Sequence, residues 1–177
     1  AKASFSIGAE SRSVFLHSPK DRKIPMAIVY IGSDHAGLGL KAALVKRLSE
    51  TGHDVRDLGP ATAESCDYPV YAKKVCEKVL ADADGAAPGD DPASYGILVC
   101  GTGIGMSMAA NHIPGIRAAL CGCEFQARAT RRHNNANVLC LGERVTGQGV
   151  ALDIAELFLS TAFEGGRHLR RVNQIEG

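Results

Sequence analysis

Short apolar runs alternate with longer amphipathic segments from residue 26 onwards. The segment 38–52 is typical of the longer ones, because Leu40, Leu44 and Leu48 share one face of a helix at this spacing. The shorter runs are rich in aliphatic residues, and we expect five strands, at 26–32, 53–59, 95–101, 115–122 and 137–142. Strands that alternate with helices form parallel sheets with helices on both sides. The pattern predicts an α/β fold, a three-layer α/β/α sandwich around a five-stranded parallel Rossmann-like sheet.

The chain of 177 residues is long enough for one domain with its own core. Residues 1–25 follow neither the helical nor the strand periodicity, and they end in a charged cluster before a proline. We interpret them as a flexible N-terminal extension or a remnant of expression, with Met26 as a candidate natural start. We expect residues 26–177 to form a single domain. Within it, residues 82–94 are rich in Gly, Pro, Asp and Ala, which is typical of an exposed loop without chemistry of its own.

The composition of the chain limits which kinds of molecule it is expected to bind. The 20 basic and 19 acidic residues leave a net charge of +1, which does not favour nucleic acid or an anionic membrane. No apolar stretch approaches the ~20 residues of a membrane span. The six cysteines lack the spacing of a zinc site or of a redox pair, so we expect free thiols, no metal and a cytoplasmic location. A small charged substrate fits these numbers.

Polar and glycine-rich stretches follow three of the predicted strands. These stretches are GSDHAG at 32–37, CGTGIG at 100–105 and LGERVTG at 141–147. In open α/β sheets, ligands bind outside the carboxyl ends of the strands. The loops after the first and third predicted strands would meet there if the sheet places those strands side by side. We therefore expect the ligand site at this edge of the sheet.

The glycines of CGTGIG are spaced for an anion rather than for a dinucleotide. Gly101, Gly103 and Gly105 give G-x-G-x-G, whereas the dinucleotide fingerprint needs G-x-G-x-x-G and a later acid. Met106 occupies the position of the third glycine, and the Gly-Lys-Ser/Thr of a P-loop is missing from the sequence. A glycine loop before a helix presents backbone N–H groups that bind phosphate or an oxyanion. The alternative is a tight strand-to-helix turn without a ligand.

Cys100 stands at the mouth of this glycine loop. Neighbouring N–H groups favour a thiolate, which can act as a nucleophile or as a proton-transferring base. A nucleophilic cysteine usually has a histidine partner, and His35 and His133 both stand near predicted strand ends. Asp34 precedes the first of these histidines, and Asn134 follows the second. The residues alone leave both roles of the thiol open.

Three arginines point to a phosphate ligand. Arg144 follows the last predicted strand, and Arg167 and Arg171 are spaced i, i+4, which places both guanidinium groups on one helical face. A planar guanidinium suits the oxygens of a phosphate. For Arg167 and Arg171 taken alone, the alternative is a solvated basic face. Together with the thiol and the glycine loop, the arginines indicate a pocket for a phosphorylated carbon skeleton.

Six linked motifs in this order and spacing resemble the type B ribose-5-phosphate isomerases of the ribose/galactose isomerase family. The resemblance runs from about Met26 to about Asn173, nearly the whole chain after the extension. The motifs are GSDHAG, DYP, CGTGIGMSMAAN, GIRAAL, RRHNNANVLCLGERV and EGGRHLRRV.

The resemblance implies an aldose–ketose isomerase that works through an enediolate, without a metal or other cofactor. By resemblance, Cys100 is the base that moves the carbon-bound proton, and Thr102 lies beside the reacting oxygens. His133 opens the furanose ring, with Asp34 as a helper. Some members use a glutamate of the glycine loop as the base. This sequence has no acid between residues 101 and 110, so it resembles the members that use a thiol.

The resemblance also implies the residues that bind the substrate. The glycines of the loop hold the enediolate oxygen, one histidine and three arginines clamp the phosphate, and two further side chains line the pocket. In that order, these residues are Gly101, Gly103 and Gly105, then His35, Arg144, Arg167 and Arg171, then Tyr68 and Asn134.

Family members are homodimers, some of them dimers of dimers, whose sites take residues of the His133 and Arg144 type from the neighbouring chain. We therefore expect a homodimer whose small-molecule partner is a sugar phosphate. The first hypothesis is interconversion of D-ribose 5-phosphate and D-ribulose 5-phosphate. One alternative is isomerisation of a six-carbon sugar phosphate, such as allose or galactose 6-phosphate. The other is a non-catalytic protein that binds a sugar phosphate.

Overall fold

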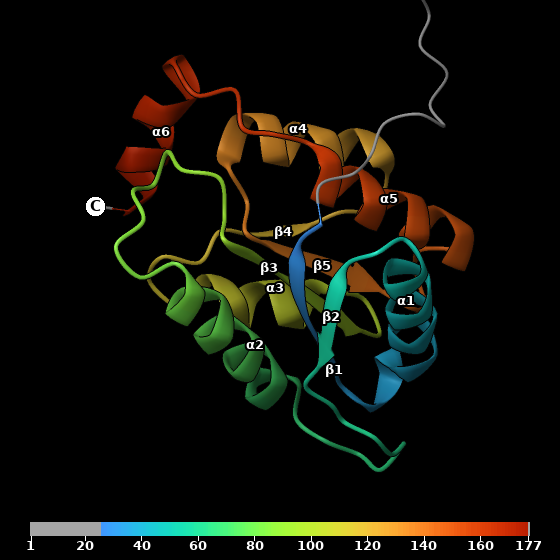
Figure 1. The fold of residues 1–177 in the computed structure, drawn as a ribbon. Helices are drawn as coiled ribbons and strands as arrows, with labels where there is room; N and C mark the ends of the chain where they lie inside the picture. The colour runs from blue at the N-terminus through green and yellow to red at the C-terminus, as the bar shows by residue number, and fades with distance from the viewer. Residues whose placement is uncertain (1–25, 177) are drawn as a thin grey trace, which may run out of the picture.

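Five parallel strands form one sheet in the part of the chain that the computed structural model describes, residues 26–176 (Figure 1). The interpretation of residues 1–25 as an extension lies outside the described residues. The strands lie in the order β2-β1-β3-β5-β4, and each neighbouring pair is parallel. In chain order, they are β1 (Ile28–Ser33), β2 (Asp54–Asp57), β3 (Ser94–Cys100), β4 (Ala118–Leu120) and β5 (Val138–Gly142).

Helices cover both faces of this sheet. On one face lie α1 (Leu38–Glu50), α4 (Glu124–Asn134) and α5 (Gln148–Ser160). On the other lie α2 (Tyr68–Asp82) and α3 (Ile104–Asn111). A short 3-10 helix, η2 (His35–Gly37), leads into α1, and α6 (Arg167–Glu176) packs against α4. The predicted three-layer sandwich around a five-stranded parallel sheet is confirmed.

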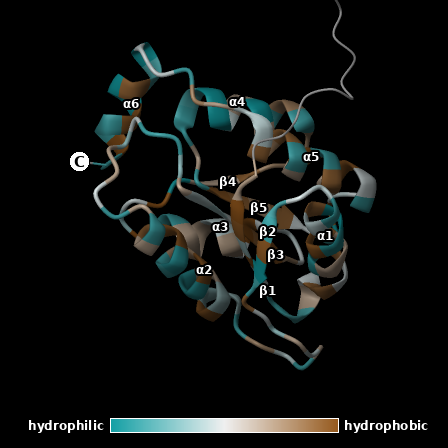
Figure 2. Cartoon of the chain, viewed as in Figure 1, coloured by the Kyte–Doolittle hydropathy of each residue, from teal (hydrophilic) through white to brown (hydrophobic). Residues whose placement is uncertain are grey.

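Alternate residues of the central strand β3 supply two separate hydrophobic cores. Ile97 and Val99 belong to the core beneath α1 and α5, whereas Leu98 and Cys100 belong to the core beneath α2 and α3. Most residues of the central strands are brown in Figure 2, as expected for a parallel sheet that is buried on both faces.

The fourth strand is shorter than the sequence predicts. Within the run 115–122, only the three residues of β4 pair as a strand. Asn137 Oδ1 accepts the Arg117 N–H at 2.8 Å. The Asn111 carboxamide pairs with the N–H of Ala118 at 2.8 Å and with its C=O at 2.9 Å. The Asn137 side chain therefore takes the Arg117 N–H, which a longer strand would have used for pairing, and β4 begins at Ala118.

Arg131 of α4 is fully buried and ties that helix to the segments around it. Its Nη1 donates to Asn135 Oδ1 at 2.7 Å, and its Nη2 lies 3.0 Å from the Asp91 carboxylate. Its Nε donates to the Thr161 carbonyl at 3.2 Å, and α5 ends just before this residue. A buried cation needs a counter-charge. The loop 82–94, predicted to be exposed and without chemistry of its own, supplies that charge through Asp91.

The two ends of the parallel strands define two opposite sides of the sheet, which we call the carboxyl edge and the amino edge. At the carboxyl edge, where the strands end, the loops after β1 and β3 meet because these strands are neighbours. This is the strand order under which the two loops were expected to meet. The amino edge is where the strands begin. Helix α4 runs from the carboxyl edge, where it follows β4, back to the amino edge, where it precedes β5 (Figure 1).

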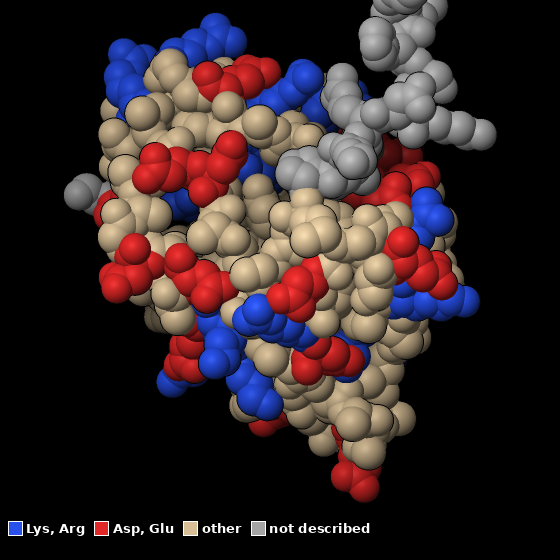
Figure 3. All heavy atoms as spheres, in the orientation of Figure 1, with Lys and Arg blue, Asp and Glu red and all other residues tan. Residues whose placement is uncertain are grey.

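Charged side chains of both signs are interspersed on the face shown in Figure 3, with basic side chains prominent at the top of the view. This distribution agrees with the near balance of 20 basic and 19 acidic residues. Within residues 26–176, no helix combines the length and the apolar character needed to cross a bilayer.

His53, directly before β2, makes the stability of the fold depend on pH. Its side chain is buried, its Nδ1 accepts the Ala27 N–H at 3.2 Å, and its Nε2 has no partner within the described chain. Burial lowers the pKa of His53, so the folded protein favours the neutral ring. The unfolded chain binds the proton more readily. The free energy of unfolding therefore falls as the pH drops below the unfolded-state pKa, about 6.5.

We predict that His53→Asn weakens this pH dependence, because asparagine can still accept the Ala27 N–H but does not titrate. Urea unfolding at a series of pH values from about 8 down to about 5 measures the effect. The free energy of unfolding should decrease less toward low pH in His53→Asn than in the wild type. The exposed His112→Asn serves as the control and should keep the wild-type slope. An unchanged slope in His53→Asn would assign the pH dependence to other groups.

Candidate active site

Cys100 is the last residue of β3, and its thiol is held at the entrance of the glycine loop. The residue is buried, with 5% of its surface exposed, and its Sγ accepts the N–H of Gly103 at 3.1 Å. This bond needs Gly103 in the left-handed region, with φ of +77°. A Cβ at that position would lie 2.5 Å from Leu120 and 2.9 Å from the backbone of Leu141. Glycine is therefore required there for both conformation and space.

Two backbone hydrogen bonds join the glycine loop to the turn after β5. The N–H of Glu143 donates to the carbonyl of Cys100 at 2.9 Å, and the N–H of Arg144 donates to the carbonyl of Gly101 at 3.0 Å. Gly142 lies so close to the loop that a Cβ would meet the Thr102 carbonyl at 2.6 Å. We call these contacts the loop clamp. They hold the loop in one position before any ligand binds.

Arg144 lies beside the glycine loop of its own chain. A Cβ on Gly101 would be 3.6 Å from Arg144 Cδ and 3.7 Å from its Nε. The structure thus groups Arg144 with Cys100 within one chain, whereas the resemblance implied that a neighbouring chain supplies it. The clamp that carries Arg144 is a product of the β3–β5 pairing, which the order of residues in the sequence does not reveal.

Glu143 is a residue that the sequence analysis missed. Its Oε2 accepts the N–H of Leu40 in the first turn of α1 at 2.9 Å. Helix α1 has no side-chain cap from its own N-cap residue, Gly37, so a residue distant in sequence satisfies this N–H. The carboxylate thus links the loop clamp to α1. No local sequence signal identifies such a cap, because the two partners are far apart along the chain.

Asp34 and His35 reach the same edge from the end of β1. Asp34 Oδ1 accepts the N–H of Ala36 at 2.9 Å, and the Asp34 N–H donates to the carbonyl of Val99 in β3 at 3.1 Å. The carboxylate therefore caps η2 and fixes the turn beside β3. His35 is exposed, and its Nδ1 lies 3.3 Å from the backbone N of Cys66.

Tyr68 and Thr102 complete the group at the carboxyl edge. A Cβ on Gly105 would lie 2.9 Å from the Tyr68 ring, so this glycine lets the ring lie directly against the start of α3. Thr102 Oγ1 accepts the N–H of Ile104 at 3.3 Å. The N–H groups of a first helical turn have no partner within their own helix, which leaves donors at this edge for an anion.

The other buried cysteines are unsuited to chemistry. All six cysteines are free, as expected. Burial raises the pKa of Cys76 and of Cys121 to about 12, and it raises the pKa of Cys140 well above the usual range. These thiols stay protonated at neutral pH and pack as small apolar side chains. Cys100 differs because a backbone N–H donates directly to its sulfur.

The remaining predicted site residues lie at the amino edge. His133 and Asn134 are the last two residues of α4. Arg167 and Arg171 belong to α6. The end of this helix lies at the amino edge, where its Glu176 pairs with Arg117, the residue just before β4. We call His133, Asn134, Arg167 and Arg171 the amino-edge group.

The two predicted parts of the site are therefore separated within one chain. An α-helix rises about 1.5 Å per residue, so the 11 residues of α4 span roughly 16 Å between the two edges. A five-carbon chain is shorter than this. One molecule of substrate cannot contact both Cys100 and His133 of the same chain.

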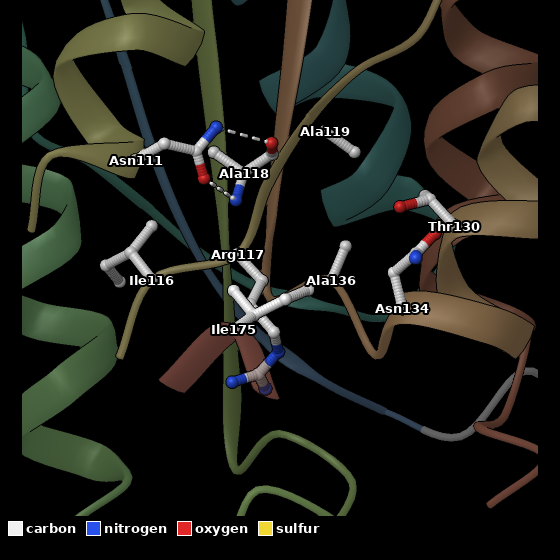
Figure 4. A pocket seen from close by; sticks show the side chains of 9 residues that line it. All are labelled: Asn111, Ile116, Arg117, Ala118, Ala119, Thr130, Asn134, Ala136 and Ile175. Carbon is white, nitrogen blue, oxygen red and sulfur yellow. Dashed lines mark hydrogen bonds between the residues drawn. The ribbon is translucent and has the colours of Figure 1, made fainter. Parts of the chain in front are cut away.

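A pocket of about 270 Å³ opens at the amino edge between α3, β4, α4 and α6 (Figure 4). Of the predicted site residues, Asn134 lines this pocket. Figure 4 shows its carboxamide on the side formed by α4, with Asn111 paired to Ala118 across from it. The space at this edge is concave and lies beside the amino-edge group.

His133, Glu164 and His168 come close enough together to be considered for a metal, with ligand atoms within 4.8 Å of one another. The two imidazole rings stack, with centroids 4.4 Å apart and planes 13° apart. An imidazole binds a metal in the plane of its ring, so two stacked rings do not converge on one ion. Arg132 lies 3.6 Å from the same carboxylate and adds positive charge. This arrangement disfavours a cation.

Comparison with known proteins identifies the family of this chain. The family model for Ribose/Galactose Isomerase matches residues 29–175. The chain is similar to ribose-5-phosphate isomerase B of Escherichia coli (strain K12), with 43% identity over 150 residues that cover 85% of this chain and 95% of that protein.

Two solved structures are similar over nearly the same range. The ribose 5-phosphate isomerase of Thermotoga maritima shares 47% identity with a TM-score of 0.77, covering 85% of this chain and 97% of that one. Ribose-5-phosphate isomerase B of Mycoplasma genitalium, solved with bound ribulose-5-phosphate, shares 40% identity with a TM-score of 0.76, covering 85% and 95%. The chain thus belongs to the ribose/galactose isomerase family.

Proposed function

We propose that this protein interconverts D-ribose 5-phosphate and D-ribulose 5-phosphate by proton transfer, without a metal. The observation that carries the proposal is the Cys100 thiol, which accepts the Gly103 N–H at 3.1 Å beside a glycine loop held by the loop clamp. A base next to an anion-binding loop suits a reaction that forms an enediolate. The names of the relatives from Escherichia coli and Thermotoga maritima support the same substrate.

The proposed chemistry moves one proton between two adjacent carbons. The Cys100 thiolate removes the proton from C2 of the open-chain aldose, and the electron pair left behind forms the C1–C2 double bond of an enediolate. Thr102 and the N–H groups of the glycine loop hold its oxygens, and a second proton, that of the O2 hydroxyl, passes to O1. The thiol then returns its proton to C1, which gives the ketose. No covalent bond to the enzyme forms.

We propose that two copies of the chain form each site. Cys100, Arg144 and the glycine loop come from one copy, and the amino-edge group comes from the other. The support is the separation of these residues by the length of α4 within a single chain. In a two-fold dimer, the carboxyl edge of each chain can face the amino edge of its partner, which gives two equivalent sites.

We predict that Cys100→Ser lowers kcat on ribose 5-phosphate by roughly 10²- to 10⁴-fold, the usual contribution of a positioned base. KM should change little, because the phosphate is held by other residues. Ketose formation measured from ribose 5-phosphate and from allose 6-phosphate tests both the thiol and the length of the sugar. Cys123→Ser, a half-buried cysteine at the start of α4, is the matched control and should keep full activity.

A kcat near the wild-type value in Cys100→Ser would remove the thiol from its role as base. Faster turnover of the six-carbon sugar would assign that substrate instead. Sugar binding without turnover or C2 proton exchange, in folded wild-type protein, would indicate a binding protein.

We predict that mixing two inactive variants restores activity. Cys100→Ser and His133→Asn damage different parts of the proposed shared site. After unfolding and refolding together in equal amounts, half of the dimers contain one chain of each kind. Each of these has one intact site, so about a quarter of wild-type activity should return. Refolding each variant alone is the control, and the absence of recovery in the mixture would place both residues in one chain's site.

A further inference from the structure

Glu164 lies between α5 and α6, and its carboxylate faces two histidines. Its Oε2 lies 4.0 Å from His133 Nε2 and 3.7 Å from His168 Nε2. Its backbone N–H donates to the carbonyl of Arg132 at 3.1 Å, which fixes the residue at the end of α4. The side chain is half-exposed, at 47%, and the packing of the fold does not depend on it. The position of this carboxylate therefore calls for an explanation other than core stability.

The two histidines differ in the proton that they can carry. Their rings stack with centroids 4.4 Å apart, so two positive charges there would repel each other. His168 is buried, and burial lowers its pKa, followed by the charges of His133, Arg167 and Arg171, whereas Glu164 acts in the opposite direction. Arg167 Nε also donates to His168 Nε2 at 3.5 Å, which requires a lone pair on that nitrogen. Burial and the surrounding cations thus favour the neutral form of His168, and His133 is the more exposed ring of the pair.

The charges around His133 are mostly positive. Arg132 precedes it on α4 and lies 3.6 Å from the Glu164 carboxylate, and Arg167 and Arg171 face the stack from α6. A proton placed on His133 therefore enters a cationic environment. Glu164 is the acidic group in the described chain that lies within ion-pair distance of this ring. Its negative charge offsets the charge of a protonated His133.

We propose that Glu164 is a positioning residue for ring opening, acting through His133 by stabilising its protonated form. This inference rests on the proposed function. In the step concerned, the O1–H proton of the furanose passes to His133, the C1–O4 bond breaks as the C1–O1 double bond forms, and His133 delivers the proton to O4. The imidazole of His133 is cationic only between these two proton transfers. Glu164 then stabilises the step that opens the sugar, while proton transfer by Cys100 does not involve it.

The test compares Glu164→Gln with wild type on two substrates. Ribose 5-phosphate must be opened first, whereas 4-deoxyribose 5-phosphate lacks the oxygen that closes the furanose and is always open. We expect kcat/KM on ribose 5-phosphate to fall roughly two- to fivefold in Glu164→Gln, the range of a half-exposed ion pair, with no change on the deoxy sugar. Glu164→Asp keeps the charge and should recover part of the loss. Glu50→Gln on α1 is the control and should behave as wild type.

A pH profile supplies a second readout that does not depend on the deoxy sugar. Loss of the carboxylate makes protonation of His133 harder, so the acid limb of the kcat/KM profile on ribose 5-phosphate should move to lower pH. An equal loss on both sugars would overturn the proposal and indicate a structural or binding role. Unchanged kcat/KM with an unchanged acid limb would also overturn it. A folded wild-type protein inactive on both sugars would instead contradict the proposed function.

Discussion

The site depends on the backbone pairing between the end of β3 and the turn after β5. Because the N–H groups of Glu143 and Arg144 donate to the carbonyls of Cys100 and Gly101, the sheet extends its order by two residues into the loop. The thiol and the donors around it are therefore positioned by the most buried part of the fold. A site of this kind does not need to reorganise when charge develops on the substrate, which is the basis of electrostatic preorganisation.

Most of the fold could be predicted from the sequence, because a parallel sheet with helices on both faces imposes its own pattern. The buried face of α1, with Leu40, Leu44 and Leu48, follows directly from helical spacing. The short fourth strand has a cause in the tertiary structure. Asn137 shortens β4 through a side-chain bond to the backbone of Arg117, a residue distant in sequence. Such bonds leave no periodic signal in the chain.

The site was predictable only in part. Residues at the carboxyl edge follow from their places at strand ends, which is why Asp34, His35 and Cys100 gather there. The position of Arg144 in its own chain depends on a strand pairing that the sequence does not specify. Glu143 and Glu164 were missed because each lies beside a partner reached through tertiary structure, Leu40 for the first and His133 for the second. Residue type shows what a side chain can do, but contacts determine which partner it acts on.

Asn111 covers part of the backbone of the edge strand β4. Its carboxamide occupies both outward-facing backbone groups of Ala118, so a strand from another chain finds nothing to pair with at that point. One amide at the end of α3 thus closes the backbone of this edge strand at Ala118 to a further strand.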